Sequence, residues 1–257
     1  MVTTPIDERT VVATLRQAGC IAAEEEAAEL ITCVDGDVQR LRDLLARRCA
    51  GEPLAWLVGS VQFCGETVLV HPGIYVPRWQ TEPMAQRASA LLPNEGIAVD
   101  FCTGSGAIAV VMSRQHPHAT VMATDIDPLA VACARANGLI AFEVDMAEGL
   151  PDGLAHSVHV ITAVVPYVPT DELVHLPRDV VAFEPLGALD GGPQGIDHLV
   201  RAVNASTALL RPGGSLLLEL GGNEAELLLP TLTQHDFQLV EHLIDEDGDL
   251  RAIVCRR

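Results

Sequence analysis

The chain has 257 residues, which is enough for one large domain or for a medium domain joined to a small one. Hydrophobic residues make up 49% of the chain, and the net charge is −19, with 35 acidic residues against 16 basic residues that are all arginine. Such an acidic protein repels phosphates, which argues against direct binding to nucleic acid or to a membrane surface. The absence of lysine excludes mechanisms that use a lysine nucleophile or Schiff base.

The seven cysteines are scattered, without a Cys-x-x-Cys pair and without a histidine at metal-ligand spacing. We therefore expect reduced thiols, no metal site and a cytoplasmic location. Residues 1–9 lack the basic patch and apolar run of a signal peptide, and no apolar run approaches the length of a membrane span. The expected partners are a protein or a small molecule, while the oligomeric state is left open.

The N-terminal part of the chain shows helical periodicity. Asp7 is expected to cap a first helix that ends at Gly19, and residues 22–34 and 38–50 have the spacing of two further helices. A unit of this size is too small to be stable alone. We expect it to cover or select a substrate, and a packing appendage without that role is the alternative.

A hairpin is expected to follow these helices. Residues 61–76 alternate in polarity around Gly65 and Gly73, which is the pattern of short strands joined by turns. We therefore predict three parts, namely a helical substrate-side domain at residues 1–60, a linking β-hairpin at 61–76 and a larger domain at 77–257.

The larger domain alternates strands and helices. Strands are predicted at residues 97–101, 120–124, 141–144, 158–163, 215–220, 237–243 and 250–255, and helices at 83–92, 107–115, 128–137 and 204–210. This order is typical of an α/β fold with a mostly parallel sheet, in which the last two strands form an antiparallel pair. Such sheets bind ligands at the carboxyl ends of their strands, where we expect Asp100, Asp125 and Asp145 to meet.

Residues 97–109, IAVDFCTGSGAIA, combine a buried strand, a glycine turn and the start of a helix. Gly104 and Gly106 permit a tight turn, and the helix directs free N–H groups at a ligand. Asp125 follows about 20 residues later, the usual distance to a carboxylate that binds ribose hydroxyls. The stretch therefore predicts a cofactor that contains a nucleoside.

Two cofactors fit this stretch. Residues 104–109 match the loose G-x-G-x-x-G/A pattern of NAD enzymes, which leaves a dehydrogenase open. Asp100 favours the other candidate, because a carboxylate just before the glycines would repel a pyrophosphate and attract the ammonium group of S-adenosylmethionine.

The segment after the predicted strand 158–163 reads Val-Val-Pro-Tyr, residues 164–167. It resembles the Asn-Pro-Pro-Tyr motif of the HemK/PrmC family of protein-glutamine N5-methyltransferases. Further matches follow the family order at residues 51–54, 59, 63–65, 72–73, 77–78, 81–82, 100–106, 184–185, 188–189, 191–192 and 195–197.

The resemblance covers nearly the whole chain and implies the fold of a class I S-adenosylmethionine-dependent methyltransferase. This fold is α/β and Rossmann-like, with a mostly parallel seven-stranded sheet and an antiparallel last strand. A small N-terminal helical domain and a linking β-hairpin precede the cofactor-binding domain at residues 77–257.

The resemblance also implies a site for S-adenosyl-L-methionine. Asp125 would bind the ribose hydroxyls, Asp145 and Met146 would flank the adenine, and Asp100 would lie near the ammonium group. The full set of implied cofactor-binding residues is Asp100, Cys102, Thr103, Gly104, Ser105, Gly106, Asp125, Ile126, Asp145, Met146 and Val164.

The acceptor side follows from the same resemblance. The implied catalytic positions are Val164, Pro166 and Tyr167, and the implied substrate-binding residues are Arg78, Trp79, Thr81, Val165 and Glu184. The implied acceptor is the side-chain amide of a glutamine in a protein such as a peptide chain release factor.

Val164 departs from the family, which has asparagine at this position. An amide nitrogen is a poor nucleophile, and the family holds its N–H groups with the asparagine oxygen and a backbone carbonyl. Loss of one such preorganised hydrogen bond costs ~10²–10³ in rate. Three alternatives follow: glutamine methylation with other acceptors compensating, methylation of a small-molecule amine, carboxylate or hydroxyl, and cofactor binding without catalysis.

Overall fold

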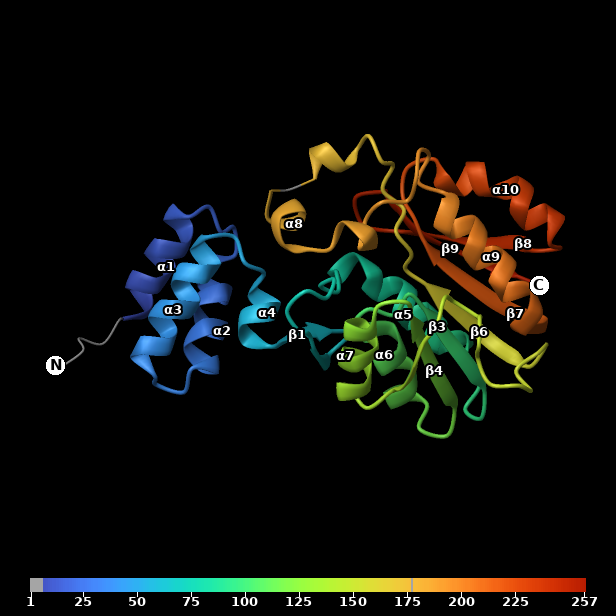
Figure 1. Cartoon of the computed structure of the whole chain (residues 1–257), viewed down its shortest axis with the longest axis horizontal. Helices are drawn as coiled ribbons and strands as arrows, with labels where there is room; N and C mark the ends of the chain where they lie inside the picture. Colours follow the sequence, from blue (N-terminus) through green and yellow to red (C-terminus); the bar gives the residue numbers. More distant parts are fainter. Residues whose placement is uncertain (1–6, 177) are drawn as a thin grey trace.

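The computed structural model describes residues 7–176 and 178–257. Figure 1 shows an N-terminal group of three helices on one side of a large twisted sheet, with a short helix and a hairpin between them. We call the three helices the helical unit. They are α1 (Glu8–Gln17), α2 (Ala23–Cys33) and α3 (Val38–Cys49).

The helical unit forms as its sequence predicts. The Asp7 carboxylate accepts a hydrogen bond from the N–H of Thr10 at 2.8 Å, which caps α1. The helices enclose their own core, in which Val11, Leu15 and Leu30 are completely buried. Each helix therefore uses one apolar stripe to pack against the other two.

Helix α4 (Leu54–Val58) and the antiparallel hairpin of β1 (Ser60–Phe63) and β2 (Glu66–Leu69) connect this unit to the rest of the chain. Trp56 in α4 is buried, and its indole N–H donates a hydrogen bond to the carbonyl of Ile74 at 2.9 Å. The Trp56 ring also meets Phe183 edge to face, with 6.4 Å between centroids. Helix α4 is thereby joined to the segment after the hairpin and to the distant Phe183.

Seven strands form the central sheet in the order β5-β4-β3-β6-β7-β9-β8. They are β3 (Ile97–Phe101), β4 (Thr120–Asp125), β5 (Ile140–Glu143), β6 (Val158–Ala163), β7 (Leu210–Glu219), β8 (Gln238–Ile244) and β9 (Leu250–Arg256). The first five run parallel, whereas β9 is antiparallel to both β7 and β8. The predicted mostly parallel sheet with an antiparallel last strand is confirmed.

Helices cover both faces of the sheet. They are α5 (Glu82–Leu91), α6 (Ala107–Gln115), α7 (Pro128–Ala136), α9 (Asp197–Leu209) and α10 (Glu224–Gln234), with α8 (Arg178–Phe183) outside the layers. Three short 3₁₀ helices lie at Trp79–Thr81, Leu173–His175 and Leu186–Ala188. None of the helices in the described parts of the chain is long and apolar enough to cross a membrane.

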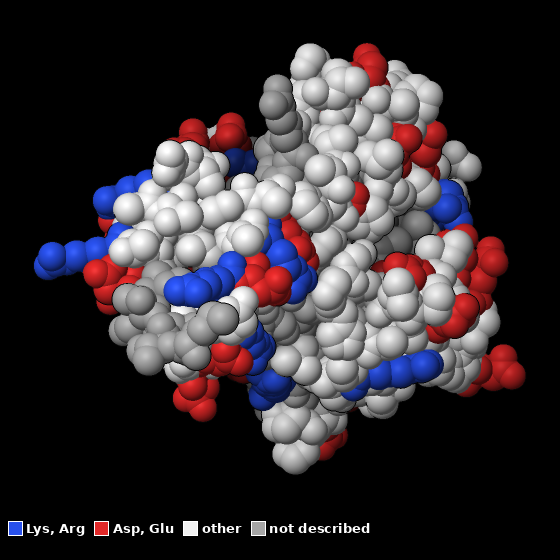
Figure 2. Space-filling view, turned by 60° about the vertical axis from the view of Figure 1, so that its left-hand side comes forward, with Lys and Arg blue, Asp and Glu red and all other residues white. Residues whose placement is uncertain are grey.

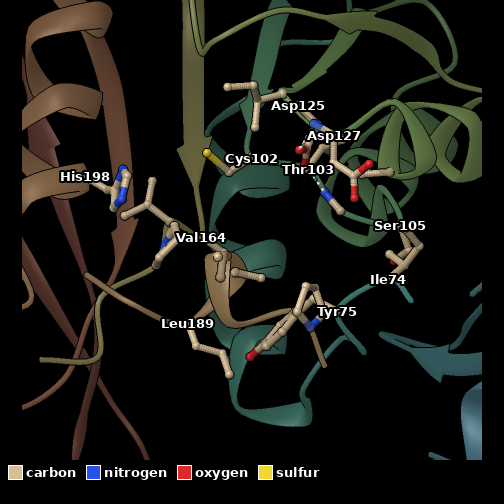
Figure 3. A pocket seen from close by; sticks show the side chains of 18 of the residues that line it. Ile74, Tyr75, Cys102, Thr103, Ser105, Asp125, Asp127, Val164, Leu189 and His198 are labelled. Atoms are coloured by element: carbon tan, nitrogen blue, oxygen red, sulfur yellow. Dashed lines mark hydrogen bonds between the residues drawn. The ribbon is translucent and has the colours of Figure 1, made fainter. Parts of the chain in front are cut away.

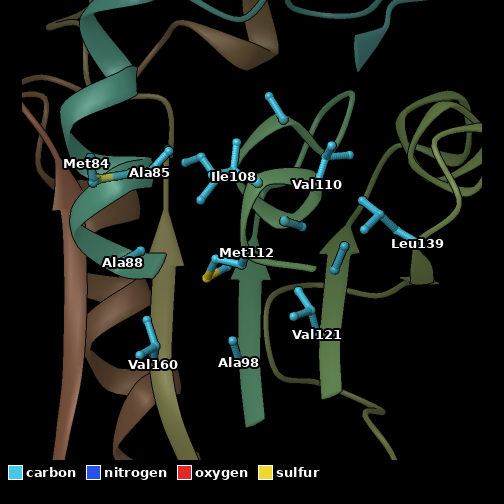
Figure 4. Close-up of a cluster of buried hydrophobic side chains, with 14 of the residues drawn as sticks. Met84, Ala85, Ala88, Ala98, Ile108, Val110, Met112, Val121, Leu139 and Val160 are labelled. Atoms are coloured by element: carbon cyan, nitrogen blue, oxygen red, sulfur yellow. The ribbon is translucent and has the colours of Figure 1, made fainter. Parts of the chain in front are cut away.

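Alternate strand residues supply the two cores. One core joins Ala98 and Val160 to α5 and α6, as Figure 4 shows with Met84, Ile108 and Met112. The other core joins the neighbouring strand residues to α9 and α10, and includes Val99, Ile161, Leu199, Leu216, Leu218 and Leu228. Both faces of the sheet are therefore covered, and the carboxyl ends of its strands are the place where a ligand can bind.

Two predicted elements start five or more residues before the expected position. The helix predicted at 204–210 begins at Asp197. The strand predicted at 215–220 begins at Leu210 and contains the Pro-Gly-Gly sequence as a bulge, because the Gly213 N–H donates to the carbonyl of Arg257 and continues the pairing. Helix α10 was not predicted, and Pro230 inside it weakens the helical pattern.

Figure 2 shows the charged side chains on one face of the molecule. Acidic side chains and arginines alternate there, and the described residues on this face form no extended basic patch. A nucleic-acid backbone binds best to a continuous basic surface, and this face does not offer one.

The turn between β3 and α6 requires glycine most strictly at position 106. Gly106 has φ +87°, and a Cβ built there would lie 2.4 Å from Cδ1 of the buried Leu139. Gly104 has φ +56°, but no atom lies within 4 Å of its Cβ position. Gly106 therefore serves close packing, whereas Gly104 leaves open space beside the backbone.

We expect Gly106→Ala to lower the free energy of unfolding by about 2 kcal/mol, because Leu139 must move in addition to the backbone strain. The matched Gly104→Ala variant bears only the strain and should lose about 1 kcal/mol. Urea denaturation of the ligand-free proteins measures both. Equal losses would contradict the packing role of Gly106.

Candidate active site

A cavity of about 380 Å³ opens at the carboxyl edge of the sheet. This volume is within the usual range of small-molecule sites. Three segments of its wall are residues 102–105 after β3, residues 164–168 after β6, and residues 73–75 and 77 after the hairpin. Figure 3 shows Cys102, Thr103 and Ser105 on the first of these segments and Tyr75 facing them from the last.

Asp125 links the ends of two neighbouring strands on the wall of this cavity. Its Oδ2 accepts the Gly104 N–H at 2.9 Å, and its Oδ1 accepts the Asp127 N–H at 3.0 Å. Each carboxylate oxygen has a further lone pair with which it can bind a ligand hydroxyl. Burial raises the pKa of Asp125, so donors from a ligand would favour its ionised form.

Asp100 lies beneath the same loop. Its side chain is almost completely buried, and its two oxygens accept hydrogen bonds from the hydroxyls of Thr103 at 2.5 Å and Thr162 at 2.6 Å. Burial raises the pKa of Asp100 to about 6 despite these two bonds. The ionised carboxylate holds Thr103 in the loop and supplies a negative charge to the floor of the cavity.

Two further side chains indicate a nucleoside ligand. The Ser105 hydroxyl lines the cavity, is buried and has no hydrogen-bond partner among the described residues. Ile126 lies on the cavity wall but is 71% exposed, so it presents an apolar surface that a flat ring would cover. The loop at residues 102–105 offers polar groups that fit the sugar of an adenosine, and the apolar surface of Ile126 fits its base.

The opposite part of the cavity is mostly apolar. Val164, Val165, Pro166 and Tyr167 line it, and Thr81 and Tyr75 face them from the segment after the hairpin. We call residues 164–167 the acceptor segment. The Tyr167 hydroxyl donates a hydrogen bond to Oε1 of Glu219 at 3.3 Å, and burial raises the pKa of Tyr167.

The structure places most of the predicted site residues around this one cavity, with four exceptions. Gly106 lies behind the loop, and Trp79 is 65% exposed. Arg78 forms an ion pair with the buried Glu184, and its guanidinium lies 4.9 Å from the centroid of the Tyr75 ring. Arg78 and Glu184 thus fix neighbouring segments without lining the cavity.

The sequence interpretation missed several residues of the cavity wall, and two of them are polar residues of one helix. His198 and Arg201 reach it from the first turns of α9, and Arg201 forms an ion pair with Asp145. Because that helix was predicted to begin at residue 204, neither residue was placed near the sheet edge. A helix start at Asp197, an acidic residue after a glycine-rich stretch, is the signal that would have located them.

Comparisons with known proteins agree with this geometry. Residues 82–149 match the family model described as methyltransferase small domain. A release factor glutamine methyltransferase from Geobacter sulfurreducens is 36% identical over 202 residues, which cover 76% of this chain and 70% of that protein. Another from Moorella thermoacetica is 38% identical over 196 residues, covering 73% of this chain and 68% of that protein.

The fold is also similar to a solved structure. The crystal structure of ribosomal protein L11 methylase from Lactobacillus delbrueckii subsp. bulgaricus has a TM-score of 0.53 at 16% identity, and the match covers 75% of this chain and 86% of that chain. Of the two cofactor interpretations, the methyltransferase is confirmed over the dehydrogenase. The chain belongs to the HemK/PrmC family of S-adenosyl-L-methionine-dependent release factor glutamine methyltransferases.

Proposed function

We propose that this protein methylates the side-chain amide nitrogen of a glutamine in a peptide chain release factor. The observation that supports this most directly is that the loop after β3 and the acceptor segment line one continuous cavity. A cofactor bound on the loop and a side chain entering beside the acceptor segment would then meet without a barrier. The relatives reported above share the name of this activity.

The part of the cavity beside the loop at residues 102–105 is assigned to the cofactor, and we call it the cofactor half. Asp125 would bind the ribose hydroxyls, Ser105 would gain a hydrogen-bond partner, and Ile126 would pack on the adenine ring. Asp100 would attract the ammonium group through its buried charge. When bound, S-adenosyl-L-methionine supplies an electrophilic methyl group on a sulfonium.

The acceptor half is assigned to the acceptor segment. Among the described residues, no hydrogen bond is made to the carbonyl oxygens of Val164, Val165 and Pro166, so these carbonyls are free to accept an N–H group of an amide. The apolar side chains exclude water, which strengthens each such bond and holds the amide nitrogen in line with the methyl group. In this proposal backbone carbonyls replace the asparagine oxygen that the chain lacks.

We expect wild-type protein to add one methyl group to the Gly-Gly-Gln glutamine of a release factor, and Val164→Asn to raise kcat. The new side-chain oxygen supplies the missing acceptor, and the gain should be ~10-fold to 10²-fold. Turnover with labelled cofactor and mass spectrometry of the release-factor peptide measure both results.

Val164→Leu is the matched control, because leucine has nearly the shape of asparagine without its acceptor. This variant should not exceed the wild-type rate. If wild-type protein leaves the release factor unmodified while it binds the cofactor, the proposed acceptor is wrong. If only Val164→Asn fails to increase kcat, the missing acceptor does not limit the reaction.

Asp125→Ala should weaken S-adenosyl-L-methionine binding about 10-fold to 10²-fold, because a carboxylate that accepts hydroxyl groups typically contributes 1.5–3 kcal/mol per charged hydrogen bond. Glu143→Ala is the control, since Glu143 pairs with Asp125 in the sheet register but is exposed and outside the cavity. Calorimetric titration compares the two. If the two variants bind the cofactor with equal affinity, Asp125 does not bind the ribose.

Cofactor binding should depend on pH through Asp100. Its pKa of about 6 in the ligand-free protein should fall when a cation binds nearby, since the cation favours the carboxylate. Affinity should therefore rise as the pH increases to about 6 and then level off, with a proton released on binding at lower pH. Calorimetry in buffers of different ionisation enthalpy detects this proton, and Asp100→Asn should remove it.

A further inference from the structure

A buried carboxylate lies directly behind the acceptor segment. Glu219 is the last residue of β7, which is paired with β6, so its side chain lies where the acceptor segment begins its course away from the sheet. Glu219 is 5% exposed, and its Oε1 accepts the hydroxyl proton of Tyr167 at 3.3 Å. Tyr167 itself lines the cavity. One hydroxyl therefore separates the carboxylate from the cavity.

Among the residues that the structure describes, no arginine forms an ion pair with this carboxylate. The two neighbouring arginines are engaged elsewhere: Arg78 pairs with Glu184, and Arg251 pairs with Asp245 and Asp249. Oε2 of Glu219 is buried and accepts no hydrogen bond of normal geometry among the described residues. A buried carboxylate with so few partners is costly in its ionised form, so a structural role alone is a poor explanation for it.

The surroundings make Glu219 a stronger base than an exposed glutamate. Burial raises its pKa, against the opposing effects of Thr81 and Tyr167 and of the positive charges of Arg251 and Arg78. Tyr75 is a further titratable group close to it, and burial raises the pKa of that phenol to about 12, so Tyr75 stays neutral. A base with a pKa nearer to the working pH accepts protons more efficiently in catalysis.

The proposed reaction needs such a base. When the amide nitrogen attacks the methyl carbon, an N–C bond forms, the S–CH₃ bond breaks, and the nitrogen keeps one proton too many. That proton must leave within a wall formed by Val164, Val165 and Pro166, which offers no side-chain acceptor. Transfer of the proton during attack also raises the nucleophilicity of the nitrogen.

We propose that Glu219 takes this proton through the hydroxyl of Tyr167. The Tyr167 oxygen accepts the amide proton while its own proton moves to Oε1 of Glu219, so one proton in total passes from the amide to the carboxylate. The proton returns to solvent after the product leaves. This inference rests on the proposed function, and it makes Glu219 a positioning residue and proton acceptor that acts only through Tyr167.

Glu219→Gln tests the inference, because glutamine can still accept the Tyr167 hydrogen bond but cannot take up a proton. We expect kcat on the release factor to fall ~10²-fold, with KM and the cofactor affinity unchanged. In wild-type protein kcat should also decrease as the pH falls through the pKa of Glu219, since only the ionised carboxylate accepts a proton. This acidic decrease should be absent from the variant.

Glu224→Gln is the matched control. Glu224 is also 5% exposed, has a buried Oε2 without a partner and has a pKa raised by burial, but it lies outside the cavity at the start of α10. Its variant should keep both the wild-type kcat and the acidic decrease. An equal loss in both variants would show a general effect of removing a buried charge and would overturn the inference.

Tyr167→Phe keeps the test decisive if Glu219→Gln does not fold. It removes the relay but not the ring, so it should lower kcat by a similar factor, and the double variant should lose no more than either single one. If the wild-type protein methylates the release factor and either Glu219→Gln or Tyr167→Phe keeps the wild-type kcat and its pH dependence, the inference is wrong while the proposed function stands. Absence of wild-type turnover would overturn the proposed function, and the inference with it.

Discussion

The hydrogen bond from the Gly104 N–H to Asp125 is the contact on which the cofactor half of the site depends. It joins the loop after β3 to the end of β4, and a second bond from the Thr103 N–H to the carbonyl of Thr124 at 3.0 Å reinforces it. Both bonds require that β3 and β4 be parallel neighbours in register, as the pairing of Phe101 with Thr124 shows. The ligand-binding loop is therefore a consequence of strand order, which the packing of two apolar cores maintains.

The two halves of the cavity solve different electrostatic problems. In the proposed function, Asp100 and Asp125 would lie near a ligand that bears positive charge, and the Thr103, Thr162 and backbone donors keep these carboxylates in position. The acceptor half would keep water and polar side chains away from the reacting amide, which would strengthen each remaining hydrogen bond. In such an environment the proposed base behind Tyr167 would have a larger effect than at an exposed site.

Local patterns were sufficient for much of the fold. Strands β3 and β6 and helix α6 have the predicted bounds, because each is a mostly apolar run of the length typical of its element. The bulge in β7 was not predictable, since it depends on pairing with Arg257 at the end of the chain. The positions of His198 and Arg201 likewise depend on tertiary contacts, although the aspartates at the strand ends were predicted from the order of strands and helices.

The acceptor half is built from segments that only tertiary contacts bring together. Trp56 in α4 donates to the carbonyl of Ile74 on the cavity wall, and its ring meets Phe183, the residue before Glu184. Glu184 in turn pairs with Arg78, whose guanidinium lies on Tyr75. Because α4 also packs on α2 and α3, this series of contacts runs from the helical unit to the acceptor wall. The helical unit and the acceptor wall are therefore held relative to each other by side-chain contacts as well as by the chain between them.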